Sequence, residues 1–288
     1  MSTSVTRADS LLSVADLQVQ YRVKGFRKPN FTALKSVSIN IRPGETLGLV
    51  GESGSGKTTL GRAVLGLAPI SAGTVYFDGA EITHYSRGQR RSLSNEIQVV
   101  FQDPYTSLNP SLTIGDILAE PLLASGTDKA SARERIDELL NQVNLPEDAA
   151  GRLPREFSGG QRQRVAIARA LALKPRLIVC DEPVSALDLS TQARVLDLFI
   201  DIQQQTGVAY LFVSHDLSVI RHISHRVAVM YRGDIVETGD VDQVTTSPVH
   251  PYTQRLLSAA PVPNPRRQLA RRDARHALLA AQGVEPRT

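Results

Sequence analysis

The stretch GESGSGKT at 51–58 decides the fold. Its glycines let backbone N–H groups curl around phosphate groups, Lys57 adds a positive charge, and the hydroxyl of Thr58 is a ligand for Mg²⁺. The apolar run LGLV at 47–50 predicts a buried strand, and TTLGRAVLGL at 58–67 predicts a helix. A strand, a loop and a helix in this order are the context in which a phosphate-binding loop works. The stretch therefore predicts a nucleotide-binding α/β core.

The composition is that of a soluble globular protein, with 41% hydrophobic and 22% charged residues among 288. No apolar run approaches the roughly 18–20 residues that span a bilayer, and the start, MSTSVTRADS, lacks the apolar core of a secretory signal. The single cysteine, Cys180, excludes an internal disulfide framework and a four-cysteine iron–sulfur site. We therefore expect a cytosolic chain without an iron–sulfur cluster.

Strand and helix patterns interleave along the chain. Residues 11–50 have a mainly β pattern, and TVYF at 74–77 followed by AEIT at 80–83 predicts a hairpin. From about 113 to 173 the pattern is helical, which predicts a helical subdomain, about 103–173, inserted between strand-rich parts. Compact apolar runs predict buried parallel strands, and Arg232-Gly233 predicts a second hairpin. These runs are 176–180, 209–214 and 226–231.

A pair of carboxylates follows one of the apolar strand patterns. LIVCD at 177–181 ends in Asp181, and a carboxylate at the carboxyl end of a parallel strand, beside a phosphate loop, is placed to hold Mg²⁺. Glu182 is placed to take a proton from a water that attacks the γ-phosphate, or to orient that water. The strand context and the phosphate loop disfavour the alternative, a solvated Asp-Glu loop.

A second glycine-rich element, SGGQ at 158–161, opens a predicted helix. Ser158 is a good N-cap, and a helix N-terminus with glycines is an anion site. Taken alone, an ordinary capped helix explains the pattern as well. Its place, about 100 residues after the phosphate loop and about 15 before LIVCDE, favours the anion site.

Together with FQDPYTSLNP at 101–110 and SHD at 214–216, these segments make the chain resemble an ATP-binding cassette (ABC) ATPase over roughly 11–262. The SGGQ signature is highly specific to that family, although Phe157 stands where its first residue is usually Leu. The resemblance implies an α/β fold: a P-loop NTPase core with a mixed sheet, an N-terminal antiparallel β subdomain and an inserted α-helical subdomain. It also implies ATP and Mg²⁺ as the bound species.

The resemblance implies a role for each matching residue. Asp181 would hold the metal with Thr58 and Gln102, and Gln102 would also touch the attacking water. Glu182 would be the catalytic base, and His215 would contact the γ-phosphate, although a lone His after a strand is otherwise a capping residue. The nucleotide would be bound by Gly51, Glu52, Ser53, Gly54, Ser55, Gly56, Lys57, Thr58, Thr59, Ser158, Gly159, Gly160, Gln161 and Asp188.

An aromatic side chain is expected to stack on adenine. Tyr21, about 30 residues before the phosphate loop, is our choice for this role. Phe26 or Phe31 could serve instead, because GFRKPN resembles an inserted loop. Any of the three aromatic residues could also be a packing residue.

The resemblance also implies a dimeric mechanism. In the family, the SGGQ signature presses on ATP held by the opposing subunit, and two cassettes close around two nucleotides in a head-to-tail sandwich. Asp188, in SALD, matches the loop that crosses to the partner subunit. Hydrolysis releases the clamp, and the motion drives a membrane partner.

The subfamily follows from SLTIGDIL at 111–118 and from SPVHPYTQRLLSAAPVP at 247–263. These segments resemble the ATPase subunits of oligopeptide, dipeptide and nickel importers. The implied partners are a second cassette subunit (a related chain or itself), two transmembrane permeases and, indirectly, an extracytoplasmic solute-binding protein, with no nucleic acid. The chain would lie peripherally at the cytoplasmic face of the inner membrane. The alternative is an ATPase subunit for nickel, another solute or export.

The end of the chain divides into two predicted parts. Residues 247–262 would be the importer-type extension, in which HPYTQRLLSAAP at 250–261 forms a docked helix with Leu256 and Leu257 buried. Residues 263–288 are rich in arginine and are expected to be a flexible, solvated tail, or a contact for anionic lipid or a partner.

Overall fold

The structure is a computed structural model that describes residues 10–22, 30–103 and 107–259. One part of it is a four-stranded antiparallel sheet with strand order β2-β1-β4-β5. In β1, Leu12 and Val14 are buried and so are Leu17 and Val19, with a shift of one residue where the pairing to β2 is irregular. The pairing of Phe77 with Ala80 confirms the predicted hairpin. The strands are β1 (Leu12–Tyr21), β2 (Phe31–Ile41), β4 (Ile70–Phe77) and β5 (Ala80–Glu81).

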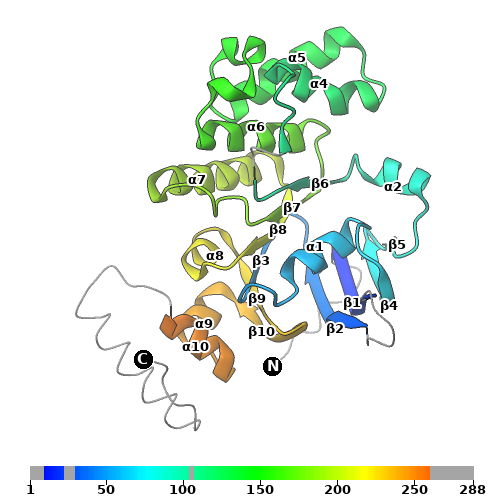
Figure 1. Ribbon diagram of the computed structural model, residues 1–288, viewed down its shortest axis with the longest axis vertical. Helices are drawn as coiled ribbons and strands as arrows, with labels where there is room; N and C mark the ends of the chain where they lie inside the picture. The colour runs from blue at the N-terminus through cyan, green and yellow to red at the C-terminus, as the bar shows by residue number, and fades with distance from the viewer. Residues whose placement is uncertain (1–9, 23–29, 104–106, 260–288) are drawn as a thin grey trace.

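A six-stranded mixed sheet with the order β10-β9-β3-β8-β7-β6 forms the centre of the molecule (Figure 1). Five strands are parallel, and β10 joins β9 through the predicted hairpin. Every residue of β3 is buried, because helices and the other sheet cover both faces. The strands are β3 (Thr46–Val50), β6 (Ile97–Val100), β7 (Leu177–Asp181), β8 (Ala209–Ser214), β9 (Arg226–Tyr231) and β10 (Asp234–Asp240).

Helices inserted between β6 and β7 form a separate layer at one end of the molecule (Figure 1). These are α4 (Ile114–Ala124), α5 (Lys129–Gln142) and α6 (Gly159–Leu171), with two short 3₁₀ turns at Glu147–Gly151 and Pro154–Glu156. One face of α5, made of Ala132, Ile136, Leu139 and Leu140, is buried in the larger hydrophobic core. The described ranges thus contain the inserted helical subdomain; its bounds, about 103–173, stay a prediction.

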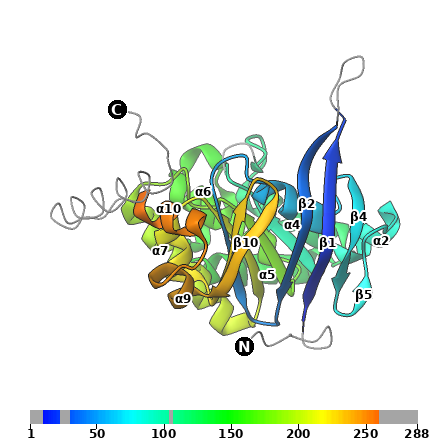
Figure 2. The same ribbon diagram turned by 90° about the horizontal axis from the view of Figure 1, so that it is seen from below.

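Six further helices are described outside this layer. They are α1 (Lys57–Val64), α2 (Arg87–Leu93), α7 (Leu189–Thr206), α8 (Leu217–Ile223), α9 (Val241–Thr246) and α10 (Pro251–Ala259). Figure 2 shows β10 beside β2, where the two sheets meet. There the N–H of Lys35 donates to the carbonyl of Gly233 at 3.0 Å, and the Lys35 ammonium pairs with Asp234 at 2.6 Å.

Two predicted boundaries were wrong by a few residues. The helix after the phosphate loop ends at Val64 rather than at residue 67, because Gly66 adopts a φ of 73° and turns the chain. The apolar run IQVVF at 97–101 predicts a strand with Gln102 at its end. Strand β6 instead ends at Val100; Phe101 is 40% exposed, and Gln102 lies beyond the strand.

Candidate active site

The phosphate loop, residues 51–56, lies between the end of β3 and the start of α1. The Lys57 ammonium donates to the carbonyl oxygens of Gly51 at 2.7 Å and Glu52 at 3.0 Å. Burial lowers the pKa of Lys57, while the carboxylates of Glu182 and Asp181 oppose that shift. Gly56 is required at its position, since a Cβ there would lie 2.8 Å from the carbonyl oxygen of Ala33. The loop is therefore tightly packed, and two of its own carbonyl oxygens fix the position of the Lys57 ammonium.

Thr58 and Asp181 come together at the carboxyl end of the mixed sheet. The Thr58 hydroxyl, in the first turn of α1, donates to Oδ1 of Asp181, the last residue of β7, at 3.0 Å. Burial raises the pKa of Asp181, and a bound cation would offset that cost. A hydroxyl and a carboxylate are the oxygen ligands that Mg²⁺ prefers. The residues present therefore fit the predicted metal.

Glu182 follows Asp181 in an unusual backbone conformation, with a φ of 50°. Its N–H donates to the carbonyl of Val213 at 3.0 Å, which ties it to β8. Its Oε2 lies 3.0 Å from Nδ1 of His215, just after β8. The predicted base and the predicted γ-phosphate contact are thus hydrogen-bonded to each other across neighbouring strands.

A cavity of about 330 Å³ opens over the phosphate loop. It joins the loop to Gln102 from the segment after β6, to Glu182 from the segment after β7, and to Phe31 at the start of β2. Its lining is Phe31, Ala33, Ser53, Gly54, Gly56, Lys57, Thr58, Thr59, Gln102 and Glu182. Segments from four distant parts of the sequence therefore converge on one polar pocket.

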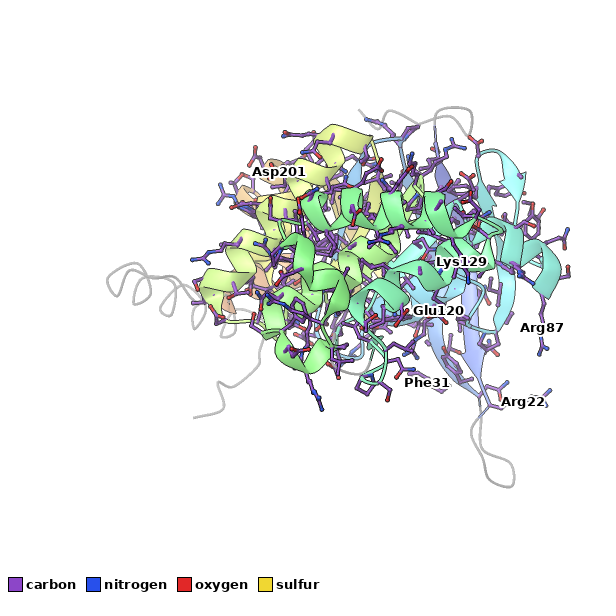
Figure 3. All side chains as sticks on the ribbon, turned by 90° about the horizontal axis from the view of Figure 1, so that it is seen from above. Arg22, Phe31, Arg87, Glu120, Lys129 and Asp201 are labelled. Carbon is purple, nitrogen blue, oxygen red and sulfur yellow. The ribbon has the colours of Figure 1, made fainter. Side chains whose placement is uncertain are left out.

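Of the three aromatic candidates, Phe31 lines this cavity and is 58% exposed. Tyr21 pairs with Phe31 across β1 and β2, but it is half-buried against the core of the smaller sheet and is not among the lining residues. Figure 3 shows Phe31 and Arg22 projecting on the same side of the molecule. Phe26 lies outside the described residues. The geometry favours Phe31 over our first choice, Tyr21, as the stacking residue.

The SGGQ segment forms the N-terminus of α6, as predicted. Ser158 is the N-cap, and a reciprocal pair joins it to Gln161: the Ser158 N–H donates to the Gln161 side chain at 2.9 Å, and its hydroxyl accepts the Gln161 N–H at 3.4 Å. Gly160 lies against α7, where a Cβ would be 2.3 Å from Cγ2 of Thr191. Within the described ranges, residues 158–161 contribute nothing to the lining of the cavity.

Asp188 is the N-cap of α7. Its carboxylate accepts the N–H groups of Ser190 and Thr191 at 3.1 and 3.0 Å and the Ser190 hydroxyl at 2.7 Å. The hydrogen bond from Ser190 is the main reason why the pKa of Asp188 lies well below its usual range. In this chain alone, Asp188 therefore has a structural role, and its predicted contact with the partner subunit stays a prediction.

Sequence reasoning missed the role of Tyr252 at this site. The helix predicted for the HPYT segment is present as α10, in which Leu256 and Leu257 are half-buried against the larger core rather than fully buried. Tyr252, in its first turn, is 2% exposed, and its hydroxyl accepts the N–H of Glu52 at 3.0 Å. The only sequence signal for this contact was the HPYT motif, which we interpreted as the start of a helix that packs on the core.

Two family matches cover most of the described chain. Residues 34–185 match the family described as ABC transporter. The matched range includes the phosphate loop, Gln102, the SGGQ segment and the Asp181-Glu182 pair. The chain belongs to the ABC transporter family. Residues 236–283 match the C-terminal region of the oligopeptide/dipeptide transporter family, and Tyr252 lies in that region.

Curated relatives of this ABC transporter chain have names that refer to the transport of peptides or glutathione. It is 51% identical over 236 residues to an oligopeptide transport ATP-binding protein of Mycobacterium tuberculosis, which covers 82% of this chain and 39% of the relative. It is 52% identical over 244 residues to a glutathione import ATP-binding protein of Escherichia coli, covering 83% and 39%. A relative in Sinorhizobium fredii named "Probable peptide ABC transporter ATP-binding protein" is 48% identical over 267 residues, covering 90% and 75%. The chain spans about two fifths of the length of the first two relatives.

Solved ABC structures share the fold. The structure of cbiO1 from Clostridium perfringens, part of the ABC transporter complex cbiONQ, matches with a TM-score of 0.74 at 28% identity and covers 83% of this chain and 92% of that one. A dimeric ATP-binding cassette in a post-hydrolysis state, bound to ADP and Pi, matches with a TM-score of 0.71 at 30% identity, covering 80% and 98%. Across residues 10–22, 30–103 and 107–259, this ABC transporter chain has no helix long and apolar enough to cross a membrane.

Proposed function

We propose that the chain is the ATP-hydrolysing subunit of a membrane ABC importer that takes up peptides or a similar solute. One observation carries the ATPase part: a single cavity joins the phosphate loop, Thr58, Gln102 and Glu182, and the Thr58 hydroxyl is hydrogen-bonded to Asp181. Membership of the ABC transporter family and the likeness to a cassette bound to ADP and Pi support this reading.

The residues of the cavity divide the chemistry among them. Lys57 and the N–H groups of the loop bind the β- and γ-phosphates, and Phe31 stacks on adenine. Thr58, Asp181 and Gln102 would hold Mg²⁺, which would supply positive charge to neutralise the phosphates. Glu182 takes the proton of the attacking water. His215, which is bonded to Glu182, orients that carboxylate and contacts the γ-phosphate.

The working unit is a pair of cassettes. The SGGQ segment is a helix N-terminus with an exposed Ser158, and residues 158–161 are not among those that line their own chain's cavity, which supports action on the nucleotide of an opposing subunit. Closure of the pair around ATP then converts nucleotide state into a change of shape, which two permease subunits use. The chain would lie peripherally at the cytoplasmic face of the inner membrane.

Import of peptides rests on the C-terminal region. The match of residues 236–283 and the names of the relatives support an importer of oligopeptides, dipeptides or a peptide such as glutathione, fed by an extracytoplasmic binding protein. Transport of nickel or another solute, or export, is the alternative, because the phosphate chemistry is the same in each case.

Uptake measurements on cells that lack this chain test the whole proposal. Labelled di-, tri- and pentapeptides, glutathione and Ni²⁺ are compared in cells complemented with the parent chain or with Lys57→Ala. The proposal expects loss of uptake of one peptide class, restored by the parent chain and not by Lys57→Ala. Normal peptide uptake with lost Ni²⁺ uptake, or accumulation of a solute inside the cells, would reject peptide import in favour of the alternatives.

A further inference from the structure

The C-terminal helix reaches the phosphate loop through one side chain. The hydroxyl of Tyr252 accepts the backbone N–H of Glu52 at 3.0 Å, across 200 positions of sequence. Tyr252 is the second residue of α10, and Glu52 is the second residue of the loop. The C-terminal region, which matches the oligopeptide/dipeptide transporter family, therefore contacts the phosphate loop.

This contact acts on a rigid unit. The N–H of Glu52 and the carbonyl of Gly51 belong to one planar peptide and point in opposite directions. The Gly51 carbonyl accepts the Lys57 ammonium at 2.7 Å. Tyr252 and Lys57 therefore hold opposite edges of the same plane, and rotation of that plane would break both hydrogen bonds at once.

The hydroxyl of Tyr252 is itself held firmly. The Tyr252 ring packs on the Tyr231 ring at the end of β9, with centroids 4.2 Å apart, and it is almost fully buried. Its N–H donates to Nδ1 of His250 at 3.1 Å, and Glu237 on β10 accepts the N–H groups of Val249 and His250. Burial also raises the pKa of Tyr252, so the hydroxyl stays neutral.

A second contact braces the other end of the loop. The N–H of Gly233, in the hairpin between β9 and β10, donates to the carbonyl of Ser55 at 2.8 Å. Gly51 also lies against β9, since a Cβ there would be 2.1 Å from the carbonyl oxygen of Met230. The loop is thus gripped at both ends by elements that come late in the sequence.

We propose that Tyr252 is a positioning residue for the phosphate loop: its hydroxyl fixes the Gly51–Glu52 peptide and, through it, the Lys57 ammonium before the nucleotide arrives. This inference rests on the proposed binding of ATP at the loop. A loop ordered in advance loses less conformational freedom on binding, so the hydrogen bond raises ATP affinity. Once ATP is bound, the phosphates themselves hold the loop, and the rate of hydrolysis no longer depends on Tyr252.

The first test needs no nucleotide. Exchange of the Glu52 amide proton is followed by NMR in the full-length chain, in the parent, in Tyr252→Phe and in Tyr231→Phe. Tyr231→Phe is the matched control, because it removes a hydroxyl from the same ring pair, and in the described part of the chain that hydroxyl makes no hydrogen bond. Exchange should be slow in the parent and in Tyr231→Phe, and about tenfold faster in Tyr252→Phe.

The second test separates affinity from turnover. KM for Mg-ATP should rise about threefold to tenfold in Tyr252→Phe, the size of one net hydrogen bond, with kcat unchanged. Tyr231→Phe should match the parent in both constants. A fall in kcat at constant KM, or an equal rise of KM in both variants, overturns the inference.

The parent alone can also overturn it. If the Glu52 amide of the unaltered chain exchanges as fast as an unprotected amide, the hydroxyl of Tyr252 does not hold it, whether or not Tyr252→Phe folds. If instead the parent fails to bind Mg-ATP, the proposed function fails, while the exchange measurement still decides the role of Tyr252.

Discussion

The carboxylate of Glu182 and the imidazole of His215 lie 3.0 Å apart and are hydrogen-bonded to each other. They follow neighbouring parallel strands, so the register of β7 and β8 sets their separation. A His that contacts both the carboxylate and the incoming γ-phosphate can fix the direction in which the carboxylate accepts a proton. The site is therefore organised around this pair as much as around the phosphate loop.

Replacing Glu182 by Gln should stop hydrolysis and spare binding. The amide keeps the size and the hydrogen bond to His215 but cannot accept a proton, so turnover should fall by about 10²–10⁴. Calorimetry should find Mg-ATP affinity close to that of the parent. Glu134→Gln, the same change at an exposed position of α5, is the control and should leave turnover intact. Turnover of Glu182→Gln at the parent rate, in the assembled complex, would remove Glu182 as the base.

The stacking residue is decided by comparing Phe31→Ala with Tyr21→Ala. Because Phe31 lines the cavity and Tyr21 does not, Phe31→Ala should weaken ATP binding by roughly tenfold, and Tyr21→Ala should not. Inorganic triphosphate, which has no base to stack, should bind equally well to both variants and to the parent. A loss of ATP affinity confined to Tyr21→Ala would restore our first choice.

Gly160 should contribute to the stability of the fold through its close packing on α7. Since its Cβ would lie 2.3 Å from Cγ2 of Thr191, Gly160→Ala should lower the free energy of unfolding by about 1–3 kcal/mol. Adding Thr191→Ser, which removes that methyl group, should restore most of the loss. Gly88→Ala in α2, where nothing lies within 4 Å of the added carbon, should instead stabilise by about 0.5–1 kcal/mol. Urea unfolding gives all three values.

Catalysis should require two subunits. Ser158→Glu places a negative charge at the N-terminus of α6, outside the lining of the chain's own cavity, so it should spare ATP binding and prevent closure of the ATP-bound pair. If the chain pairs with itself, mixing Lys57→Ala with Ser158→Glu leaves one intact interface, and part of the activity should return. Light scattering and ATPase assays measure both effects. Full activity in an isolated monomer would contradict this mechanism.

Acid should weaken the cap of α5 in a defined direction. A hydrogen bond from the Ser131 hydroxyl, together with backbone N–H groups, lowers the pKa of Asp128 below its ordinary value of 3.8. The capping stabilisation is therefore present above pH 3.8 and is lost as pH falls through the lower, folded-state pKa. The difference in unfolding free energy between the parent and Asp128→Asn should shrink over that pH range. Ser131→Ala removes a hydrogen bond that lowers the pKa of Asp128, so the pH range over which the stabilisation is lost should become narrower. Urea midpoints from pH 6 to pH 3 check this; a gap that is independent of pH would contradict it.

Local patterns predicted those parts of the fold that local physics controls. The strand at 47–50 was recognised because a buried parallel strand must be apolar throughout, and the Asp181-Glu182 pair because a strand end fixes its place. The end of α1 was missed because a glycine two residues beyond Val64 turns the chain, and apolar periodicity does not register that turn.

Contacts between distant segments were beyond the sequence patterns. The choice between Tyr21 and Phe31 depends on which side chain of a strand pair points into the cavity, and no local sequence pattern gives the register of that pair. The hydrogen bond between Tyr252 and Glu52 joins two segments 200 residues apart, and the packing of Gly160 on Thr191 depends on how two helices cross. Residues 158–161, in turn, were assigned through the resemblance to a family and not through any contact in this chain.

Glu182 has a left-handed backbone conformation, so the residue that best serves ATP hydrolysis at this position differs from the residue that best serves thermal stability. A side chain with a φ of 50° costs about 1 kcal/mol or more relative to glycine, which adopts that conformation freely. Glu182→Gly should therefore unfold at a higher temperature than the parent while hydrolysing no ATP. Any selection for heat resistance alone would push this position away from glutamate, so such a screen must be coupled to transport if it is to yield working proteins.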